Sequence, residues 1–250
     1  LATSTLSKKY PQIRTCLIIL NDICTKITTV LVSLIPIVVF CSMAKMMVSI
    51  DLSALLNVAS WIPLNYAGCF VMLGVYILLL LVVGRLNPLK FLHKFYPAMI
   101  TAFSLASSNA SLPTSIKQSE EMGISKRIYS FSLPLGATIN MNGSCIMLMI
   151  TSLFMAKIFN ITVTGTMLTS LFVSILVLSL GAPGVPGAAL VCCTLLVPQI
   201  GVPTEAVSLI MGLYPIVSMI MVCMNVTGDA VATAIVARHE NLLDLQKFNK

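Results

Sequence analysis

Charged residues are scarce, since Asp, Glu, Lys and Arg make up 9% of the 250 residues whereas hydrophobic residues make up 58%. A soluble domain carries about a quarter charged residues, so this chain cannot build a surface that faces water. The composition therefore predicts an all-α, multi-pass protein of the cell membrane, with the lipid bilayer as a partner. The net charge of +7 indicates basic cytoplasmic loops, and no basic patch interleaved with aromatic residues suggests a nucleic-acid partner.

Paired cysteines and histidines are also lacking. The eight Cys residues form no C-x-x-C pair and mostly lie in apolar runs, so we interpret them as small core residues and expect neither a disulfide framework nor a zinc site. The expected spans contain no His and no paired carboxylates. This absence argues against an intramembrane enzyme, and we expect no organic cofactor.

One carboxylate stands out against this background. From Ile158 to Ala237 the only charged residues are Glu205, which follows a loop-like stretch, and Asp229, which has apolar sequence on both sides. A carboxylate in such a segment is costly in hydrocarbon, so we expect it to face a polar cavity and to have a partner.

The same stretch holds no Lys or Arg, so a cation from solution is the natural partner. Hard cations such as Na⁺ are bound by oxygen atoms, which Asn225, Thr227, Asp229 and nearby backbone carbonyls would supply. Two alternatives stay open: a protonated Asp229 that is hydrogen-bonded inside a helix bundle, and an Asp229 that carries a proton in a proton-coupled carrier.

Two long apolar runs open the chain. Ile23–Val48 is interrupted by Pro36, which predicts a kinked helix. Trp61–Gly84 contains no charge and predicts a membrane span, with Trp61 and Tyr66 as anchors at the membrane interface.

The next segments are too short or too interrupted to cross a bilayer. Ala98–Ala106 leads into Ser107–Pro113, and small polar residues closed by a proline do not continue a helix through lipid. We therefore predict a re-entrant hairpin over residues 89–118 with its tip buried in protein. A second hairpin is predicted over residues 164–200, with the Gly- and Pro-rich Ser179–Gly187 at its tip.

Each hairpin is followed by a long segment with a polar interruption. Residues 128–156 are interrupted at Gly136–Ser144, and residues 206–238 at Asn225–Asp229. We predict helices broken at mid-membrane, whose exposed carbonyls coordinate an ion. The alternative for Gly136–Ser144 is a helix-packing face with bridging Asn side chains. The second half repeats the plan of the first, which indicates an inverted repeat with a transport site at the bilayer midplane.

Four motifs together resemble the glutamate transporter family, the dicarboxylate/amino acid:cation symporters. They lie at Ser107–Pro113, Leu133–Gly143, Gly184–Gly187 and Asn225–Asp229. The resemblance extends from about Asp22 to His239.

The resemblance implies a homotrimer of eight-helix subunits with two re-entrant hairpins, in which a transport domain moves like an elevator against a scaffold. This chain resembles the fifth helix onward, so four helices are expected to be absent. Residues 1–88 are then scaffold-side spans, residues 89–240 the transport domain and residues 241–250 a polar tail. The trimer is expected to form through the absent and N-terminal helices.

The resemblance also implies Na⁺ as the coupling ion and a small-molecule substrate. One sodium site matches Gly136, Asn140, Asn225 and Asp229. A second matches Thr138, Ser179, Leu180 and Ala182. Substrate contacts match Ser107, Ser108, Asn109, Met141, Ser144, Gly184, Val185 and Asn225.

Departures from the family pattern narrow the expected activity. Asn142 stands where the family has an Asp, so a third ion site is weakened or lost. Ser218, Met221 and Val222 stand where the family has an Asp for the substrate amino group, an Arg in members with acidic substrates, and often a Thr. Without that Arg a second substrate carboxylate would be buried unpaired, so we predict a small neutral amino acid or similar solute.

The same departures leave another function open. The chain is alternatively a degenerate relative that does not transport and acts as a channel or an interaction subunit. Asn225 and Asp229 argue against this alternative, because a packing protein has no use for an unpaired buried carboxylate.

Overall fold

The computed structural model describes residues 60–181 and 184–249 continuously, together with Val58 and scattered positions between residues 12 and 44. The chain forms two compact units, Leu1–Ser42 and Met43–Lys250. In the first unit the described residues are helical apart from Leu34, which lies in a turn. Most of the predicted span Ile23–Val48, and Ala182 of the predicted second sodium site, lie outside the described residues.

In the second unit the described elements of regular structure are helices, apart from one isolated β-bridge. Its helices are α5 (Trp61–Val82), α6 (Pro88–Leu105), α7 (Ser108–Glu121), α8 (Lys126–Ile139), α9 (Asn142–Ile158), α10 (Gly165–Gly181), α11 (Ala188–Leu196), η1 (Val197–Ile200), η2 (Thr204–Val207), α12 (Ser208–Met211), α13 (Tyr214–His239) and α14 (Leu245–Asn249). Three described segments are long and apolar enough to cross a membrane: α5, the α8–α9 pair and α13. The predicted membrane class is therefore confirmed.

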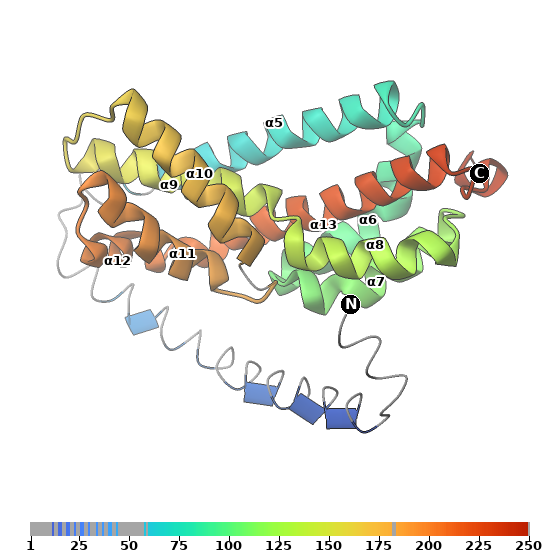
Figure 1. Ribbon diagram of the computed structural model, residues 1–250, viewed down its shortest axis with the longest axis horizontal. Helices are drawn as coiled ribbons and strands as arrows, with labels where there is room; N and C mark the ends of the chain where they lie inside the picture. The colour runs from blue at the N-terminus through green and yellow to red at the C-terminus, as the bar shows by residue number, and fades with distance from the viewer. Residues whose placement is uncertain are drawn as a thin grey trace. The chain divides into compact units, whose positions relative to one another are not determined.

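Helix α13 is the core of this unit (Figure 1). It packs against α5, α6, α7, α8 and α9, and every residue from Ile220 to Val231 is buried. A helix that is apolar around its whole circumference is expected to be buried in this way. Its few polar side chains must therefore find their partners on the neighbouring helices.

The predicted break at Asn225–Asp229 is wrong, because α13 is one continuous helix and begins at Tyr214 instead of residue 206. The hydroxyls of Thr227 and Thr233 donate to carbonyls one turn back, which keeps them inside the helical pattern. The side chains of Asn225 and Asp229 bond to α8 and α9 instead of competing for their own backbone. Polar residues end a helix only when they take over its backbone hydrogen bonds.

The predicted break between α8 and α9 is confirmed, and it is shorter than expected. Only Asn140 (φ −92°, ψ 92°) and Met141 (φ −114°, ψ 45°) leave helical geometry. Only these two residues separate the end of α8 from the start of α9, at the point where both helices meet α13.

Helices α6 and α7 pack as a hairpin, joined by Ala106 in a left-handed conformation and by Ser107. As expected, Ser107–Pro113 does not continue the preceding helix: α6 ends at Leu105, and a new helix, α7, begins at Ser108 and continues through Pro113. The reason is local: the Ser107 hydroxyl accepts a hydrogen bond from the Ala110 N–H at 3.3 Å and caps the new helix.

Helices α10 and α11 also pack against each other, and Gly187 (φ 87°) precedes α11. The two hairpin tips meet, because Gly184 O accepts hydrogen bonds from Ser107 Oγ (3.0 Å) and from the Asn109 N–H (3.3 Å). That these hairpins are re-entrant, that they form an inverted repeat, and that residue 88 separates two domains stay predictions.

Trp61 does not act as an interfacial anchor, so that expectation is wrong. Its side chain is fully buried, and its Nε1–H donates to Thr151 Oγ1 on α9 at 3.0 Å. The ring packs inside the protein because α9 supplies the partner that its N–H requires.

The polar C-terminal segment is bound to the turn between α7 and α8. Leu243 bridges Ile124, the Ser125 N–H donates to Leu242 O (2.9 Å), and the Asp244 N–H donates to Gly123 O (2.9 Å). Phe248 on α14 is fully buried, which anchors the segment.

Candidate ion and substrate sites

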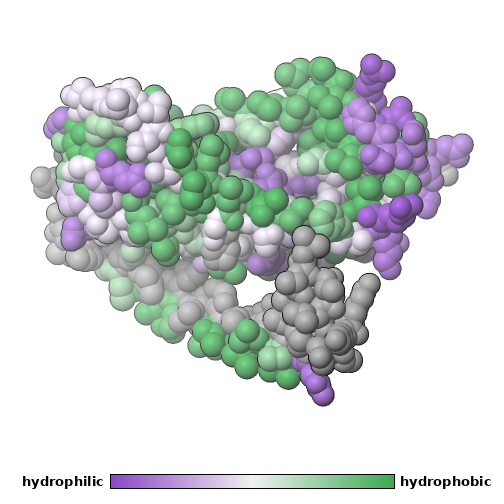
Figure 2. Space-filling view, viewed as in Figure 1, coloured by the Kyte–Doolittle hydropathy of each residue, from purple (hydrophilic) through white to green (hydrophobic). Residues whose placement is uncertain are grey.

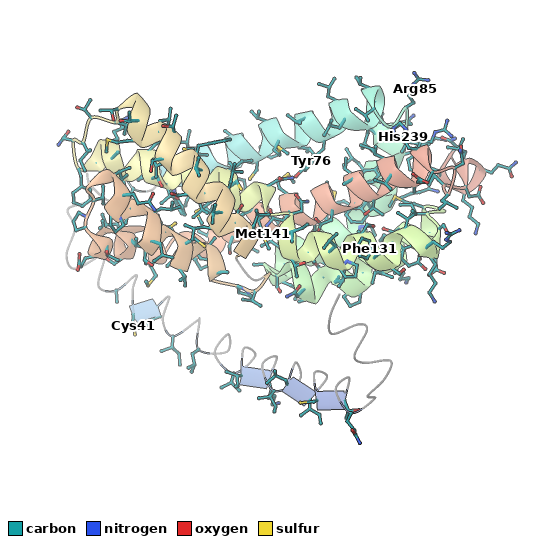
Figure 3. All side chains as sticks on the ribbon, in the orientation of Figure 1. Cys41, Tyr76, Arg85, Phe131, Met141 and His239 are labelled. Carbon is teal, nitrogen blue, oxygen red and sulfur yellow. The ribbon has the colours of Figure 1, made fainter. Side chains whose placement is uncertain are left out.

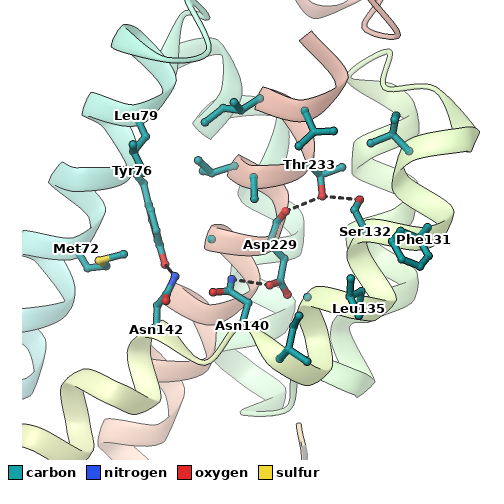
Figure 4. A pocket seen from close by; sticks show the side chains of 18 of the residues that line it. Met72, Tyr76, Leu79, Phe131, Ser132, Leu135, Asn140, Asn142, Asp229 and Thr233 are labelled. Atoms are coloured by element: carbon teal, nitrogen blue, oxygen red, sulfur yellow. Dashed lines mark hydrogen bonds between the residues drawn. The ribbon is translucent and has the colours of Figure 1, made fainter. Parts of the chain in front are cut away.

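Asp229 lies in the wall of a cavity of about 690 Å³ between α5, α8 and α13. Its side chain is 6% exposed, and the cavity is otherwise lined mainly by apolar side chains. Figure 4 shows the carboxylate between α13 and the end of α8. Asp229 thus borders a cavity as expected, but the expectation that this cavity is polar is wrong, because apolar side chains make up most of its lining.

The break in the α8–α9 pair meets this carboxylate. Asn140 Nδ2 donates to Asp229 Oδ1 at 2.7 Å and to the Asn225 carbonyl oxygen at 3.3 Å. A Cβ placed on Gly136 would lie 2.5 Å from Asp229 Oδ1, so only glycine lets the carboxylate approach. The structure thus brings together all four residues of the first predicted sodium site.

This arrangement fits a cation. The Asn140 amide nitrogen marks a point that lies 2.7 Å from a carboxylate oxygen and 3.3 Å from a carbonyl oxygen. The oxygen and nitrogen of an Asn side chain exchange places when the amide turns over, since either end fits the same space. With the amide reversed, Asn140 Oδ1 would take the place of Nδ2 beside the Asp229 carboxylate and the Asn225 carbonyl, and a Na⁺ bound among these three oxygens would offset their repulsion.

Two hydroxyl groups form a chain of contacts that starts at the backbone carbonyl of Asp229. The Thr233 hydroxyl donates to the Asp229 backbone carbonyl at 2.7 Å, and Ser132 Oγ lies 2.8 Å from Thr233 Oγ1. These contacts tie α8 to α13 one turn beyond the carboxylate (Figure 4). Thr227, which we named among the possible ligands, bonds instead to the Cys223 carbonyl.

Tyr76 joins α5 to the same cluster, and the sequence analysis missed it. Its hydroxyl accepts a hydrogen bond from Asn142 Nδ2 (3.0 Å) and donates to the Met224 carbonyl (3.1 Å). A Cβ on Gly228 would lie 2.5 Å from this hydroxyl, so glycine at that position makes room for Tyr76. One signal was available: a tyrosine in an otherwise apolar span needs a hydrogen-bond partner.

The side chain of Asn225 forms hydrogen bonds with the first turn of α9. Its Oδ1 accepts the Gly143 N–H at 2.7 Å, and its Nδ2 lies 3.2 Å from Ser144 Oγ. A Cβ on Gly143 would lie 2.2 Å from the Met221 carbonyl oxygen, so the two helices touch through backbone. Asn225 therefore satisfies a free N–H in the first turn of α9, as a cap from a neighbouring helix.

A second, much smaller cavity of about 20 Å³ lies next to Asn225. Most of the predicted substrate contacts line it. These residues are Ser108, Met141, Ser144, Gly184, Val185, Met221, Val222 and Asn225. Ala188, Ala189 and Tyr214 also line it and were not predicted.

Three predicted substrate contacts do not line this cavity. Ser107 and Asn109 bond to Gly184 at the hairpin tips, and Ser218 Oγ donates to the Pro215 carbonyl at 2.8 Å. Sequence spacing places Ser218 on α13 but does not show that its hydroxyl is used within the helix.

The described residues of the second predicted sodium site lie on α8 and α10, which contact each other. Thr138 Oγ1 donates to the Leu135 carbonyl (2.7 Å) and Ser179 Oγ donates to the Leu176 carbonyl (2.9 Å), both within their own helices. The side chain of Leu180 is exposed. This second site stays a prediction.

In the described part of the chain, no three His, Cys, Asp or Glu side chains gather into a metal-binding cluster. The described cysteines are free. A single carboxylate with neutral oxygens suits a monovalent cation better than a transition metal.

Comparison with known proteins agrees with this geometry. The sequence matches the sodium:dicarboxylate symporter family over residues 1–239. Excitatory amino acid transporter 2 of Homo sapiens is 30% identical over 222 residues, which cover 87% of this chain and 39% of the relative. Neutral amino acid transporter A of Bos taurus is 34% identical over 181 residues, covering 72% of this chain and 34% of the relative.

The chain spans about two fifths of the length of the human relative, 39%. The matched relatives are named as transporters, which agrees with the expectation that the chain belongs to a transport protein and not to an enzyme. The family match covers both hairpins, the α8–α9 break and α13. This chain therefore belongs to the sodium:dicarboxylate symporter family.

Proposed function

We propose that this chain forms the ion- and substrate-binding part of a sodium-coupled symporter for a small neutral amino acid. The proposal rests on the small cavity beside Asn225, where helix N-termini meet and the described lining residues include no charged side chain. The cluster around Asp229 would bind the coupling ion.

The start of three helices borders the small cavity. Ser108 opens α7, Ser144 lies in the first turn of α9, and Ala188 opens α11. Helix N-termini carry partial positive charge and free N–H groups, which favour an anionic group such as the carboxylate of an amino acid.

Among the described residues that line this cavity there is no Lys, Arg, Asp or Glu. A second substrate carboxylate would therefore be buried without a cationic partner, at a cost that favours solutes with a neutral side chain. The names of the relatives include both excitatory and neutral amino acid transporters, and this lining favours the neutral class.

The cavity, at about 20 Å³, is smaller than the proposed substrate. This volume admits about one water molecule and no amino acid. Binding would therefore require the hairpin tips to separate at Gly184, which breaks the bonds from Ser107 and Asn109. We propose that the α10–α11 hairpin is the moving gate, because Gly184 and Gly187 allow its tip to move.

The remaining features of the proposal follow the family resemblance. They are re-entrant hairpins in an inverted repeat, an elevator movement of residues 89–240 against a scaffold, and a homotrimer. Asn142 forms a neutral bond with Tyr76, which supports the expectation of a weakened third ion site.

The test is the thermal unfolding of the purified protein in Na⁺ and in K⁺, with a panel of amino acids. We expect Na⁺ alone to raise the midpoint and a small neutral amino acid to raise it further. An ion at about one hundred times its Kd adds about 2.7 kcal/mol to the free energy of unfolding. Asp229→Asn should remove both effects, whereas Glu205→Gln, which changes an exposed carboxylate on η2, should retain them.

Each other outcome supports a different function. Identical curves in Na⁺ and K⁺ with every ligand would favour a degenerate relative that acts as a channel or interaction subunit. A midpoint that depends on pH through Asp229 and is independent of Na⁺ would favour a proton-coupled carrier. Stabilisation by glutamate instead of a neutral amino acid would refute the substrate class alone.

A further inference from the structure

Four tripeptides of the type Asn-x-Ser/Thr, the acceptor sequence for N-linked glycosylation, occur in the chain. They begin at Asn109, Asn142, Asn160 and Asn225. The tripeptide alone is a weak signal, because an attached sugar also requires a position outside the packed helices and on the side of the membrane away from the cytoplasm. The place of each tripeptide in the fold therefore decides which of them can be modified.

Three of the four tripeptides lie where the helices pack around the two sites described above. Asn109 lies at the α6–α7 tip, Asn142 opens α9, and Asn225 lies within α13. In each of them the Ser or Thr is buried, and its hydroxyl is bonded to a nearby carbonyl or sulfur atom. These residues are Ser111, Ser144 and Thr227. A sugar attached there would force the packed helices apart.

The tripeptide at Asn160 lies in the loop of residues 159–164 between α9 and α10. Asn160 is left-handed (φ 53°), and the Ile161 N–H donates to Ala156 O at 2.8 Å, so the backbone closes the end of α9 by itself. The Asn160 and Thr162 side chains are exposed, and within the described residues neither forms a hydrogen bond. The amide and the hydroxyl that the modification requires are therefore both free.

The length of α9 places this loop outside the lipid. Helix α9 has 17 residues and extends about 25 Å from the break at Asn140 and Met141. Half of a bilayer, with its headgroups, measures about 20–22 Å. With the break near the middle of the membrane, as predicted, the loop after α9 lies in water. This position follows from the axial length of α9, so it does not depend on which helices pack beside it.

Charge indicates which side of the membrane the loop faces. Figure 1 shows the α9–α10 loop at the opposite end of the unit from the C-terminus. At the C-terminal end Arg85 follows α5, Lys126 opens α8, and Arg238 lies in the last turn of α13. Figure 3 labels Arg85 and His239 there, and Figure 2 shows hydrophilic residues gathered at that end.

The other end has little basic charge. Among the described residues of this unit, Lys157 is the single Lys or Arg on the side of the α9–α10 loop. Basic residues predominate on the cytoplasmic side of membrane proteins. The loop with Asn160 therefore faces the other side, which is the side on which N-linked sugars are attached.

We propose that Asn160 carries an N-linked glycan. Its amide nitrogen forms a bond to the anomeric carbon of an oligosaccharide that is supplied as a lipid diphosphate. The bond from that carbon to the diphosphate oxygen breaks, the lipid diphosphate leaves, and the amide nitrogen loses one proton. The Thr162 hydroxyl is the part of the tripeptide that the transferring enzyme recognises. The polar sugar cannot enter hydrocarbon, so it holds the α9–α10 end of the protein outside the membrane.

The test uses the full-length protein, expressed in a eukaryotic cell and purified from its membranes. Enzymatic removal of N-glycans in water labelled with heavy oxygen converts each glycosylated Asn into a labelled Asp. Chymotrypsin cuts after Phe159 and Leu168 and so releases the peptide that contains position 160. We expect the label at Asn160 in most copies of the protein. We expect no label at Asn109, Asn142 or Asn225.

Four variants define the acceptor. Asn160→Gln and Thr162→Ala should each remove the label and shift the gel mobility by one glycan. Thr162→Ser keeps the hydroxyl and should retain the glycan. Thr164→Ala is the matched control, since it removes an exposed hydroxyl from the same loop outside the tripeptide and should also retain the glycan. The unfolding midpoint of each variant after deglycosylation verifies that it is folded.

Three results would overturn the proposal. They are an unlabelled Asn160 in the unaltered protein, a label that persists in Thr162→Ala, and a label that is lost in Thr164→Ala. A label at Asn109, Asn142 or Asn225 would refute the argument that packing excludes these positions. None of these readouts depends on sodium or on transport, so they stand apart from the test of the proposed function.

Discussion

Asn140 donates a 2.7 Å hydrogen bond to Asp229, and this contact joins the break between α8 and α9 to the middle of α13. The carboxylate is buried at the point where the backbone of the neighbouring helix is interrupted. Two helices thus share one charged group, and a change at either partner should alter how the other is held.

Asn140→Ala should destabilise the protein in the absence of sodium. The change leaves Asp229 Oδ1 without its amide donor, and loss of a hydrogen bond to a charged group costs about 1.5–3 kcal/mol. Thermal unfolding in K⁺ measures this loss. Gln246→Ala, at an exposed position on α14, is the control and should have little effect. An unchanged midpoint for Asn140→Ala would show that water satisfies the carboxylate equally well.

Gly136→Ala should lower the free energy of unfolding, although alanine favours helices more than glycine does. The added Cβ would lie 2.5 Å from Asp229 Oδ1, so the carboxylate must move, and overpacking of this kind costs about 1–3 kcal/mol. Gly74→Ala is the matched control on α5, because its Cβ would meet nothing within 4 Å. There the same change should be neutral or stabilise by about 0.5–1 kcal/mol, measured by thermal unfolding. Equal effects at the two glycines would contradict the packing argument.

Tyr76→Phe should loosen the contact between α5 and the α8–α9 break. The change removes the partner of Asn142 Nδ2 and one bond to the Met224 carbonyl, at a cost of about 1 kcal/mol. Tyr66→Phe provides the comparison, since the Tyr66 hydroxyl makes its bond, to the Ile216 carbonyl, at a less buried position than that of Tyr76. If both changes lower the unfolding midpoint equally, the buried position of Tyr76 has no special role.

Asn142→Asp should make stability depend more steeply on sodium. Position 142 lines the same cavity as Asp229, so the change places a second carboxylate in a largely apolar site. Two like charges there are costly unless cations neutralise them. We expect a lower midpoint in K⁺ and a steeper rise as Na⁺ is added. Asn142→Ala, which removes the amide without adding charge, should not show the steeper rise.

Phe248→Ala should detach the C-terminal segment from the turn between α7 and α8. Phe248 is fully buried, and truncation of a buried Phe costs about 3–5 kcal/mol. Phe131, which is 69% exposed, gives the control Phe131→Ala with a small expected effect. Limited proteolysis after residue 240 measures detachment directly. A segment that stays resistant in Phe248→Ala would show that its backbone bonds suffice.

The amino-acid sequence alone determined the membrane class, because so few charges cannot cover a soluble surface. It also predicted the span α5 and an interruption within Gly136–Ser144, which the structure narrows to Asn140–Met141. Asn140, Asn225 and Asp229, which meet in the structure, were likewise visible as rare polar residues in apolar sequence.

Only the tertiary structure decided how those polar groups are used. Asn225 and Asp229 do not break α13, because α8 and α9 supply their partners from outside the helix. Ser218 bonds within its own helix, Trp61 is buried against α9, and Tyr76 on α5 bonds to Asn142 and to the Met224 carbonyl. Whether a polar side chain bonds to its own helix or to a neighbour depends on which groups the packed helices bring within about 3 Å, and sequence periodicity does not contain that information.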